Sequence, residues 1–387
     1  MTRLRSYPLS SILSSTLSSP WARRYGPWLV LLVAAAAYYP RFIYAPAGMD
    51  LYAQAAACLL KGQMLETCDP LFTYPPIFAF IVLPLEPLPA WLRDVVWYFI
   101  TLAATVGLFR LSEMVATNAL AAPLTAAEQR WVRLIVLLLS LKLILAVFEN
   151  QAYDALVVLF VVAGLAALVS GRALESGAGL GFAAALKATP LIFLPYLLWK
   201  RHFAAAAAFI VVFAVASYLP DLFFTPAGAA HGYFNSWLRE VAGASFGIDP
   251  GAAKVEFWRG ANLLNHSLRG AVSLNIDERT QHALHRAVLA AVDGVFVVFV
   301  GALLMLSPRH KQSIAIDGSL LLVSMLMLSP MTSQSHYVAL VLPYMTLVTL
   351  QFRDERTANL GRAVLAASFV LVTLTTTAFW CSARWCC

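Results

Sequence analysis

The stretch Gly48-Met49-Asp50-Leu51-Tyr52 stands just after the first apolar segment of the chain, and Phe72-Thr73-Tyr74-Pro75-Pro76 follows about twenty residues later. Asp50 lies where a membrane helix is expected to leave the bilayer, and a carboxylate beside an apolar slab is a candidate functional group. Aspartate is also a favoured residue at a helix N-terminus, and residues 51–60 have a helical pattern. Asp50 is therefore either a reactive group or a helix cap.

The composition is that of a protein with many membrane spans. Hydrophobic residues make up 60% and charged residues 12% of the 387 residues, and the mean hydropathy is +0.74. Since a spanning helix needs about 20 apolar residues, the chain has room for roughly 9–11 membrane segments and one sizeable loop. We expect an all-α polytopic membrane protein with one membrane-embedded domain, which includes interfacial helices and helices broken by proline.

The net charge of +7 does not indicate nucleic-acid binding, because Lys and Arg cluster in loops between apolar segments rather than on one face. Clusters of this kind mark cytoplasmic loops. Arg23 and Arg24 precede the first apolar segment, which predicts a cytoplasmic N-terminus and places Asp50 on the opposite side. The predicted organisation is a cytoplasmic leader (1–27), a membrane domain (28–381) with extracytoplasmic loops at 45–90 and 220–286, and a short tail (382–387).

Loop charges also predict that residues 75–88 do not cross the membrane. This segment is apolar but contains Pro84 and Pro87, which disfavour a continuous helix. If it crossed, Arg110, Arg130 and Arg133 would lie outside, against the positive-inside rule. We therefore interpret it as interfacial or re-entrant, and residues 51–60 as an amphipathic helix along the membrane surface.

Residues 177–199 are predicted to enter the membrane and turn back. Arg172 precedes this segment and Lys200 follows it, so both of its ends are cytoplasmic. Pro190 interrupts the helix and gives two short arms, with Lys187 at the tip. A cation at that depth is tolerated where it lines a cavity. The alternative is a structural lysine that extends its ammonium group to the interface.

This topology brings four polar groups to the outer side, namely Asp50, Lys187, residues 262–269 and His336. The sequence has no Gly-x-Gly-x-x-Gly, Walker loop, His-Glu-x-x-His or Gly-x-Ser-x-Gly, which argues against an ATPase, a zinc protease and a serine hydrolase. The five cysteines lack metal-ligand spacing, and whether Cys58 and Cys68 form a disulfide is left open.

A series of short motifs carries a resemblance to a known family. In order, they are Asp50 with Tyr52, Lys61-Gly62, Tyr74-Pro75-Pro76, Glu149-Asn150-Gln151, Leu186-Lys187-Ala188-Thr189-Pro190, Asn265-His266-Ser267, and Ser329-Pro330 with His336-Tyr337. With these motifs, from about residue 28 to residue 350, the chain resembles glycosyltransferase family 87. That family belongs to the GT-C membrane glycosyltransferases and includes mycobacterial mannosyltransferases that extend phosphatidylinositol mannosides. One departure is that residues 331–335 lack the tryptophan expected before His336.

The resemblance implies a GT-C-like helix bundle that transfers a hexose, mannose foremost, from a polyprenyl-phosphate donor to a hydroxyl of a lipid or glycan acceptor. The reaction is expected on the extracytoplasmic face of the cell (inner) membrane, whose lipids are further partners. Asp50 is carried over as the general base, since a hydroxyl attacks faster when a carboxylate takes its proton. No cofactor is implied, a divalent metal has no support in the sequence, and nucleic acid is not expected.

The remaining candidate residues are predicted to hold the substrates. Lys187, His336 and Arg269 suit the phosphate of the leaving group, because fixed donors and cations stabilise its charge. Inversion needs one carboxylate, whereas retention would need a second, for which Glu149 is the nearby candidate. We expect inversion. The further substrate-binding residues that the resemblance implies are Tyr74, Glu149, Gln151, Asn265 and Ser267.

Two other classes of function fit some of these features. A transporter or a lipid-linked-sugar flippase would use Asp50 and Lys187 as binding groups at a broken helix. A noncatalytic assembly subunit would need no base at Asp50. The long polar loop at 220–286 and the gathering of polar groups at one face, rather than at mid-membrane, favour the enzyme.

Overall fold

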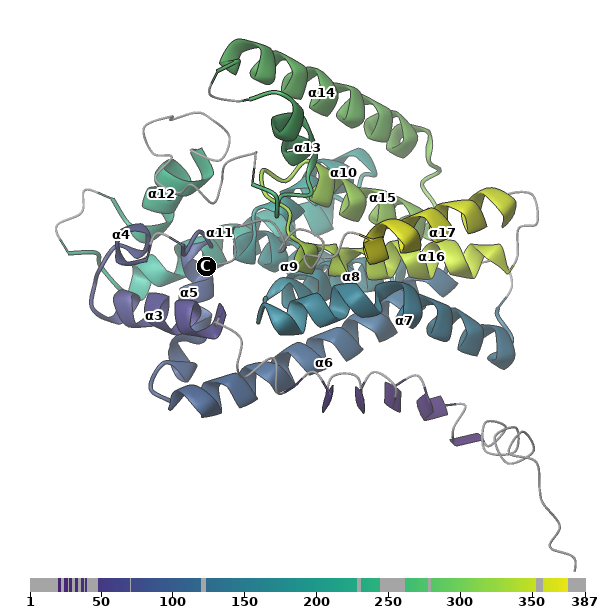
Figure 1. Ribbon diagram of the computed structural model, residues 1–387, viewed down its shortest axis with the longest axis horizontal. Coiled ribbons are helices and arrows are strands. Elements are labelled where there is room, and N and C mark those ends of the chain that lie inside the picture. Colours follow the sequence, from purple (N-terminus) through teal and green to yellow (C-terminus); the bar gives the residue numbers. More distant parts are fainter. Residues whose placement is uncertain are drawn as a thin grey trace, which may run out of the picture.

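The computed structural model describes residues 48–69, 71–119, 123–227, 231–243, 262–277, 280–352 and 358–374, together with part of 20–39. These residues form helices and loops without any strand (Figure 1), which confirms the predicted all-α polytopic membrane protein. The predicted span at 28–44 is described only in part. Most of the leader, including residues 1–19, and the tail at 382–387 lie outside the described residues.

Helices of many lengths make up the described part of the chain. The helices of the central bundle and the peripheral α14 are α6 (Ala90–Thr117), α7 (Ala126–Glu149), α8 (Asp154–Val169), α9 (Ala173–Leu186), α11 (Phe203–Phe223), α14 (His282–Leu306), α15 (Ile314–Met327), α16 (Val341–Gln351) and α17 (Ala358–Leu374). The remaining helices are α3 (Gly48–Leu60), α4 (Leu65–Cys68), α5 (Pro76–Val82), α10 (Phe193–Trp199), α12 (Tyr233–Trp237) and α13 (Leu268–Asn275). By length and composition, α6, α7, α11 and α14 are candidates to cross a membrane.

The segment at 75–88 forms the seven-residue helix α5 and a short 3₁₀ turn at residues 83–85. Both are shorter than the roughly 20 residues that a spanning helix needs, which is consistent with the prediction that this segment does not cross. Helix α3 differs from the expected surface helix, because Met49, Tyr52 and Leu59 are buried and the helix packs on α5. The loop predicted at 220–286 is described only in part, since residues 228–230, 244–261 and 278–279 lie outside the described residues. Helix α11 continues through Pro220 to Phe223, α14 begins at His282, and α12 and α13 lie between them.

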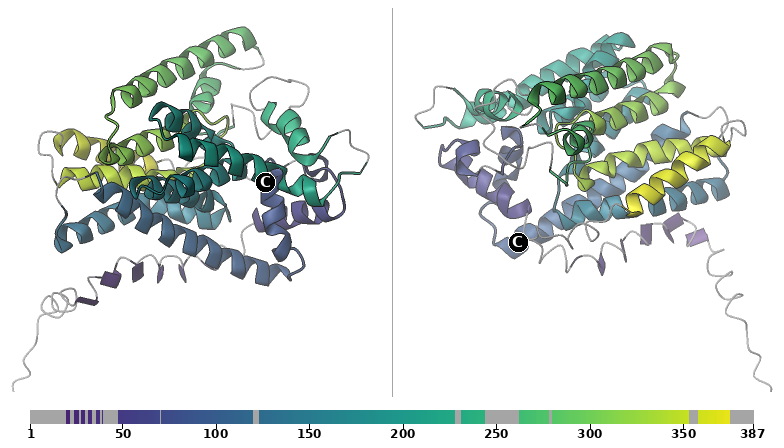
Figure 2. Two further views of the ribbon diagram at one scale, coloured as in Figure 1. Left: turned by 180° about the vertical axis from the view of Figure 1, so that it is seen from behind. Right: turned by 45° about the horizontal axis from the view of Figure 1, so that its top comes forward.

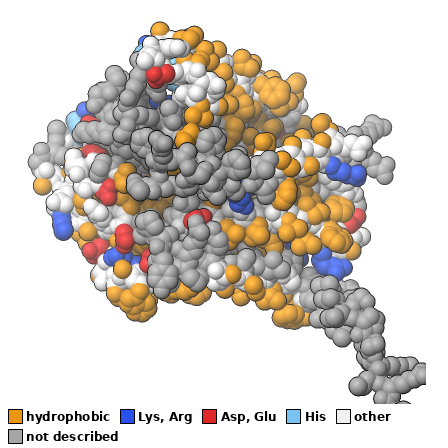
Figure 3. Space-filling view, in the orientation of Figure 1, with side chains coloured by type: hydrophobic (Ala, Val, Ile, Leu, Met, Phe, Trp, Pro, Cys, Tyr) orange, Lys and Arg blue, Asp and Glu red, His pale blue; other side chains and the backbone are white. Residues whose placement is uncertain are grey.

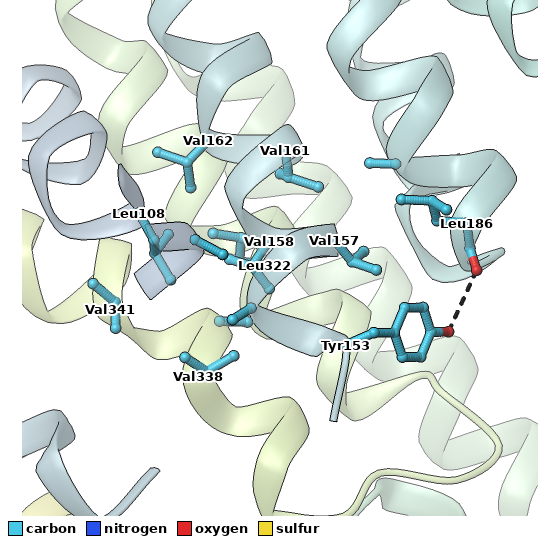
Figure 4. Packing of buried hydrophobic residues seen from close by; sticks show 14 of the residues in the cluster. Leu108, Tyr153, Val157, Val158, Val161, Val162, Leu186, Leu322, Val338 and Val341 are labelled. Atoms are coloured by element: carbon cyan, nitrogen blue, oxygen red, sulfur yellow. Dashed lines mark hydrogen bonds between the residues drawn. The ribbon is translucent and has the colours of Figure 1, made fainter. Parts of the chain in front are cut away.

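Helix α8 lies at the centre of the bundle. Its sequence is apolar on every side, and a helix of this kind is buried all round. Figure 4 shows its valines packed against side chains from α6, α15 and the start of α16. The labelled members are Leu108, Val157, Val158, Val161, Val162, Leu322, Val338 and Val341. This packing fixes the position of Asp154, the first residue of α8.

Helices α9 and α11 pack with their backbones in close contact. A Cβ atom on Gly177 would overlap the Ala205 carbonyl, and one on Gly181 would overlap the Phe209 carbonyl. Two glycines four residues apart allow helices to approach in this way. Gly177 lies against Ala205, and Gly181 lies against Phe209 four residues further along both helices, so α9 and α11 run in the same direction.

The direction of these helices confirms the predicted hairpin. Helix α8 is antiparallel to α9, since Gly164 lies against Ser176 whereas Phe160, earlier in α8, lies against Gly179, later in α9. Because α11 starts only a few residues after α10 and runs parallel to α9, α10 must return toward the start of α9. We call the end of the bundle that holds Asp154 and Lys187 the site end. The opposite end, which holds Arg172 and Lys200, is the basic end.

The lipid-facing character of the molecule is clearest at α14. This helix stands apart from the other long helices in Figures 1 and 2, and only His285 and Val300 in it are buried. Figure 3 shows that hydrophobic side chains cover much of the described surface between the two ends of the molecule. Such a surface suits contact with lipid rather than water.

A buried ion pair at the basic end ties the hairpin to α15. The Lys200 ammonium lies 3.0 Å from Asp317 Oδ2, and the two side chains are 2% and 0% exposed. The same ammonium donates to the Ser307 carbonyl at 2.9 Å, and Tyr196 donates its hydroxyl to Asp317 at 3.2 Å. Three segments of the chain therefore meet at one charge pair.

We expect Lys200→Met to destabilise the protein strongly, because it leaves Asp317 buried without its counter-ion. Breaking a buried pair in this way costs about 3–5 kcal/mol. The measurement is thermal unfolding of the purified protein in detergent. Adding Asp317→Leu should restore much of the stability. Arg172→Met is the matched control, since its pair with Glu175 is exposed. Equal effects of Lys200→Met and Arg172→Met would contradict the prediction.

Candidate functional site

A small pocket opens at the site end, where the start of α8, the end of α9 and the loop before α16 meet. The empty space at this place is about 260 Å³, a volume that includes open solvent at the mouth. Its lining consists of Asp154, Val157, Val158, Lys187, Thr189, Met325, Leu326, Ser329, Thr332 and His336. Apolar walls with a few convergent polar groups are typical of a ligand site.

Asp154 organises the polar side of the pocket. It is buried, and the Lys187 ammonium donates to its Oδ1 at 2.7 Å. The Ser335 hydroxyl donates to its Oδ2 at 3.1 Å. A carboxylate at the N-terminal end of a helix is also stabilised by the helix dipole. Because Lys187 and Ser335 both donate to it, Asp154 is suited to hold the lysine in place.

Pro190 explains why Lys187 lies at this point. Proline has no N–H, so the helical hydrogen bond to the Leu186 carbonyl cannot form, and α9 ends. The Tyr153 hydroxyl donates to that carbonyl instead, at 3.3 Å, as the dashed line in Figure 4 shows. Lys187 is extended, and its ammonium lies 5.7 Å from the centre of the Tyr153 ring. The prediction of Lys187 at the tip of a hairpin agrees with this geometry.

His336 lies in a 3₁₀ turn (Gln334–Leu340) between α15 and α16. The Ser333 backbone N–H donates to its Nδ1 at 3.1 Å, so the hydrogen of the neutral ring resides on Nε2. Nε2 lies 3.8 Å from Asp154 Oδ1. Burial lowers the pKa of His336 to about 4, against the opposing effect of Asp154. The neutral ring therefore presents one N–H to the pocket at physiological pH.

The arrangement can bind an anionic oxygen. Lys187 has three N–H donors, of which Asp154 accepts one, and His336 supplies a further N–H beside it. Hydrogen bonds from an ammonium to a phosphate oxygen are short and strong. Lys187 and His336, predicted separately from the sequence, thus lie in one pocket.

Asp50 is not among the pocket-lining residues. It lies in the first turn of α3, its side chain is 67% exposed, and it forms an ion pair with Arg93 of α6 at 3.3 Å. The neighbouring Met49 N–H donates to Gln151 Oε1 at 2.7 Å, three residues before Asp154 in the chain. Asp50 therefore lies at the site end with an accessible carboxylate, and its role as a base stays a prediction.

Tyr74 belongs to an aromatic cluster between α3 and the pocket. Its ring centre lies 5.7 Å from that of Tyr52 and 4.8 Å from that of Tyr153. Burial raises the pKa of Tyr74 to about 12, and the nearby charge of Asp154 acts in the same direction. The hydroxyl remains protonated and can act as a hydrogen-bond donor.

Asn265 and Ser267 form hydrogen bonds within the protein. Asn265 donates to the Pro330 carbonyl at 2.9 Å and accepts from the Thr332 N–H at 3.1 Å. Ser267 donates to Asn265 Oδ1 at 2.8 Å and caps α13 by accepting from the Gly270 N–H. These bonds join the loop before α13 to the segment that leads to His336. Asn265 and Ser267 do not line the pocket, but their bonds hold the segment that leads to His336 in place. Their predicted contact with substrate stays a prediction.

The other three predicted residues also lie outside the pocket lining. Glu149 is the last residue of α7 and is half-buried. Arg269 lies on α13 and interacts electrostatically with Asp293 of α14. Gln151 is buried, and its side chain bonds to α3 and α6. Of the nine residues predicted from the sequence, only Lys187 and His336 line the pocket.

Sequence reasoning missed Asp154, Ser335 and Thr332. One signal for Asp154 was available, because it is the acid that opens the apolar run of α8, and an ionisable residue at a membrane segment is a functional candidate. Ser335 and Thr332 carried no such signal. Ser335 bonds to Asp154 across more than a hundred residues of chain, and Thr332 bonds to Leu326 and Asn265, so only the folded chain places these two residues in the pocket.

Cys58 and Cys68 form a disulfide between α3 and α4. The other three cysteines, at 381, 386 and 387, lie outside the described residues. The described part of the chain contains no group of three or more His, Cys, Asp or Glu side chains that could hold a metal ion.

Comparisons with known proteins identify the family of this chain. The model of glycosyltransferase family 87 matches residues 72–330. Over 347 residues, the chain is 29% identical to a protein of Mycobacterium tuberculosis (strain CDC 1551 / Oshkosh). That relative is described as a polyprenol-phosphate-mannose-dependent alpha-(1-2)-phosphatidylinositol pentamannoside mannosyltransferase, and the match covers 84% of this chain and 73% of the relative. No solved structure matches the chain.

Proposed function

Because this chain belongs to glycosyltransferase family 87, we propose that it transfers a hexose, mannose foremost, from a polyprenyl-phosphate donor to a hydroxyl of a lipid or glycan acceptor. The observation that carries the proposal is the pocket in which Lys187 and His336 converge. Both offer N–H donors at the end of a helix bundle whose sides are apolar. A donor with a lipid tail and a phosphate matches this arrangement, because the tail suits the apolar sides of the bundle and the phosphate suits the N–H donors of the pocket.

The proposed reaction is a direct displacement at the anomeric carbon. The acceptor oxygen forms a bond to that carbon while the bond from the carbon to the phosphate oxygen breaks. Asp50 takes the acceptor proton, and the electron pair of the broken bond stays on the polyprenyl phosphate. Lys187 and His336 stabilise the charge of that phosphate. A single carboxylate as base gives inversion of configuration.

The assay incubates the purified full-length protein in liposomes with polyprenyl-phosphate mannose, polyprenyl-phosphate glucose or a nucleotide sugar, together with glycolipid acceptors. We expect a product from a polyprenyl-phosphate sugar, with an anomeric configuration opposite to that of the donor. Mass spectrometry and NMR of the product provide the readout. Transfer from the nucleotide sugar alone, or retained configuration, would contradict the proposal.

The site end is proposed to face the extracytoplasmic side. Positive residues at the basic end support this orientation, among them Arg130 in the second turn of α7, Arg172 and Lys311. The disulfide between Cys58 and Cys68 also supports it, since disulfides form in oxidising compartments.

We expect reporter fusions to place the two ends of the bundle on opposite sides of the membrane. A fusion after Lys200 should give a cytoplasmic signal, and a fusion after Cys387 an external one. The physical reason is the retention of Lys-rich and Arg-rich loops in the cytoplasm. Alkaline phosphatase and a fluorescent protein that folds in the cytoplasm form a matched reporter pair. An external signal after Lys200 would overturn the orientation.

A further inference from the structure

Gln151 occupies an unusual position in the loop between α7 and α8. Its backbone has a positive φ of 49°, a conformation that residues other than glycine rarely adopt. Its side chain is buried, with 1% exposure for the residue. Residues held in such conformations persist where the surrounding structure determines them, and they are common near functional sites.

The side chain and backbone of Gln151 bond to two other elements. Its Oε1 accepts from the Met49 N–H at 2.7 Å, and its Nε2 donates to Asp94 Oδ1 at 3.3 Å. Its backbone carbonyl accepts from Trp97 Nε1 at 2.8 Å. These bonds determine which way the amide of Gln151 faces. They join the first turn of α3, which carries Asp50, to α6 and to the loop that leads to Asp154.

Gly48 lets this contact form. A Cβ atom at this position would lie 2.7 Å from the Asn150 carbonyl oxygen and 3.3 Å from Gln151 Cβ. Only a glycine allows the start of α3 to approach the loop this closely. The first turn of α3 is therefore held against the loop by backbone packing as well as by the bond from Met49.

We propose that Gln151 is a positioning residue that sets the place of Asp50 relative to the pocket that contains Asp154. The proposal rests on Asp50 as the base of the proposed function. Gln151 then acts through Asp50, and its amide is not itself a substrate contact. A small displacement of the base from its reacting geometry lowers turnover without weakening donor binding at Lys187.

The test exchanges donor and acceptor across one hydrogen bond. In Gln151→Glu, the new carboxylate faces the carboxylate of Asp94, and the repulsion between them displaces it and weakens its bond from the Met49 N–H. We expect kcat to fall about tenfold to a hundredfold, the range for a misplacement of about 1 Å, with the donor KM unchanged. Asp94→Asn alone keeps the bond, because its amide oxygen accepts from Gln151, and should resemble wild type.

The double variant Gln151→Glu/Asp94→Asn restores the bond with its direction reversed, since the new asparagine donates to the new glutamate. Its kcat should recover most of the loss, and its net charge equals that of wild type. A double variant no better than Gln151→Glu would overturn the proposal. So would a kcat for Gln151→Glu equal to that of wild type.

Hydrogen–deuterium exchange of the peptide that covers α3 separates this proposal from the proposed function. Exchange in the first turn of α3 should rise in Gln151→Glu and return to the wild-type rate in the double variant. Unchanged exchange in Gln151→Glu would overturn the positioning role. Full activity of Asp50→Asn would instead refute the role of Asp50 as the general base. The exchange rates would still decide whether Gln151 holds the first turn of α3 in position.

Discussion

The Asp50→Asn variant is expected to lose sugar transfer while folding as wild type does. General-base catalysis contributes about 10²–10⁴ in rate, and an amide cannot take a proton at neutral pH. Asp50 is exposed on the first turn of α3, so the substitution creates no buried unpaired group. Its bond from Arg93 at 3.3 Å can form equally to an asparagine oxygen. Steady-state transfer from a polyprenyl-phosphate sugar measures the loss.

Asp69→Asn is the matched control, because it makes the same chemical change on an acid of the same extramembrane region. Asp69 accepts from the Leu71 N–H at 2.8 Å, a bond that asparagine can keep. We expect this variant to retain transfer. Asp50→Ala should show whether the charge at the start of α3 matters for folding, since an acid in the first turn is worth about 0.3–1 kcal/mol. Near wild-type turnover of Asp50→Asn would refute the role of Asp50 as the general base.

Lys187→Ala is expected to cause the second large effect, a loss of both stability and donor use. The variant leaves the buried carboxylate of Asp154 without the ammonium that now lies 2.7 Å away. Loss of one partner of a buried pair costs about 3–5 kcal/mol. It also removes the cation proposed to face the donor phosphate, so the donor KM should rise more than the acceptor KM. Thermal unfolding and kinetics with each substrate varied provide the two measurements.

A double variant separates these two effects. Lys187→Ala/Asp154→Asn removes the unpaired charge, because asparagine is neutral and can still accept from Ser335. We expect its unfolding temperature to recover toward wild type while the donor KM stays high. If the donor KM recovered together with stability, Lys187 would have a structural role alone.

Several features of the fold could be predicted because they depend on local properties of the chain. Apolar length and loop charge predicted α6, α7, α11 and α14, since the bilayer selects long apolar helices. Pro190 predicted the break after Leu186, because a proline removes one specific backbone donor. The proline-rich segment at 75–88 was recognised as too irregular to cross for the same reason.

The sequence by itself determined a helical membrane protein with Lys187 at the turn of a hairpin, and its motifs indicated the family. Only the tertiary structure decided that Asp154 holds Lys187 and that Ser335 completes the site, because these contacts join segments far apart in the chain. It also decided that Asn265 and Gln151 form hydrogen bonds within the protein. An amide side chain has the same donors and acceptors whether it binds a ligand or a loop, and the packing of the helices selects its partner.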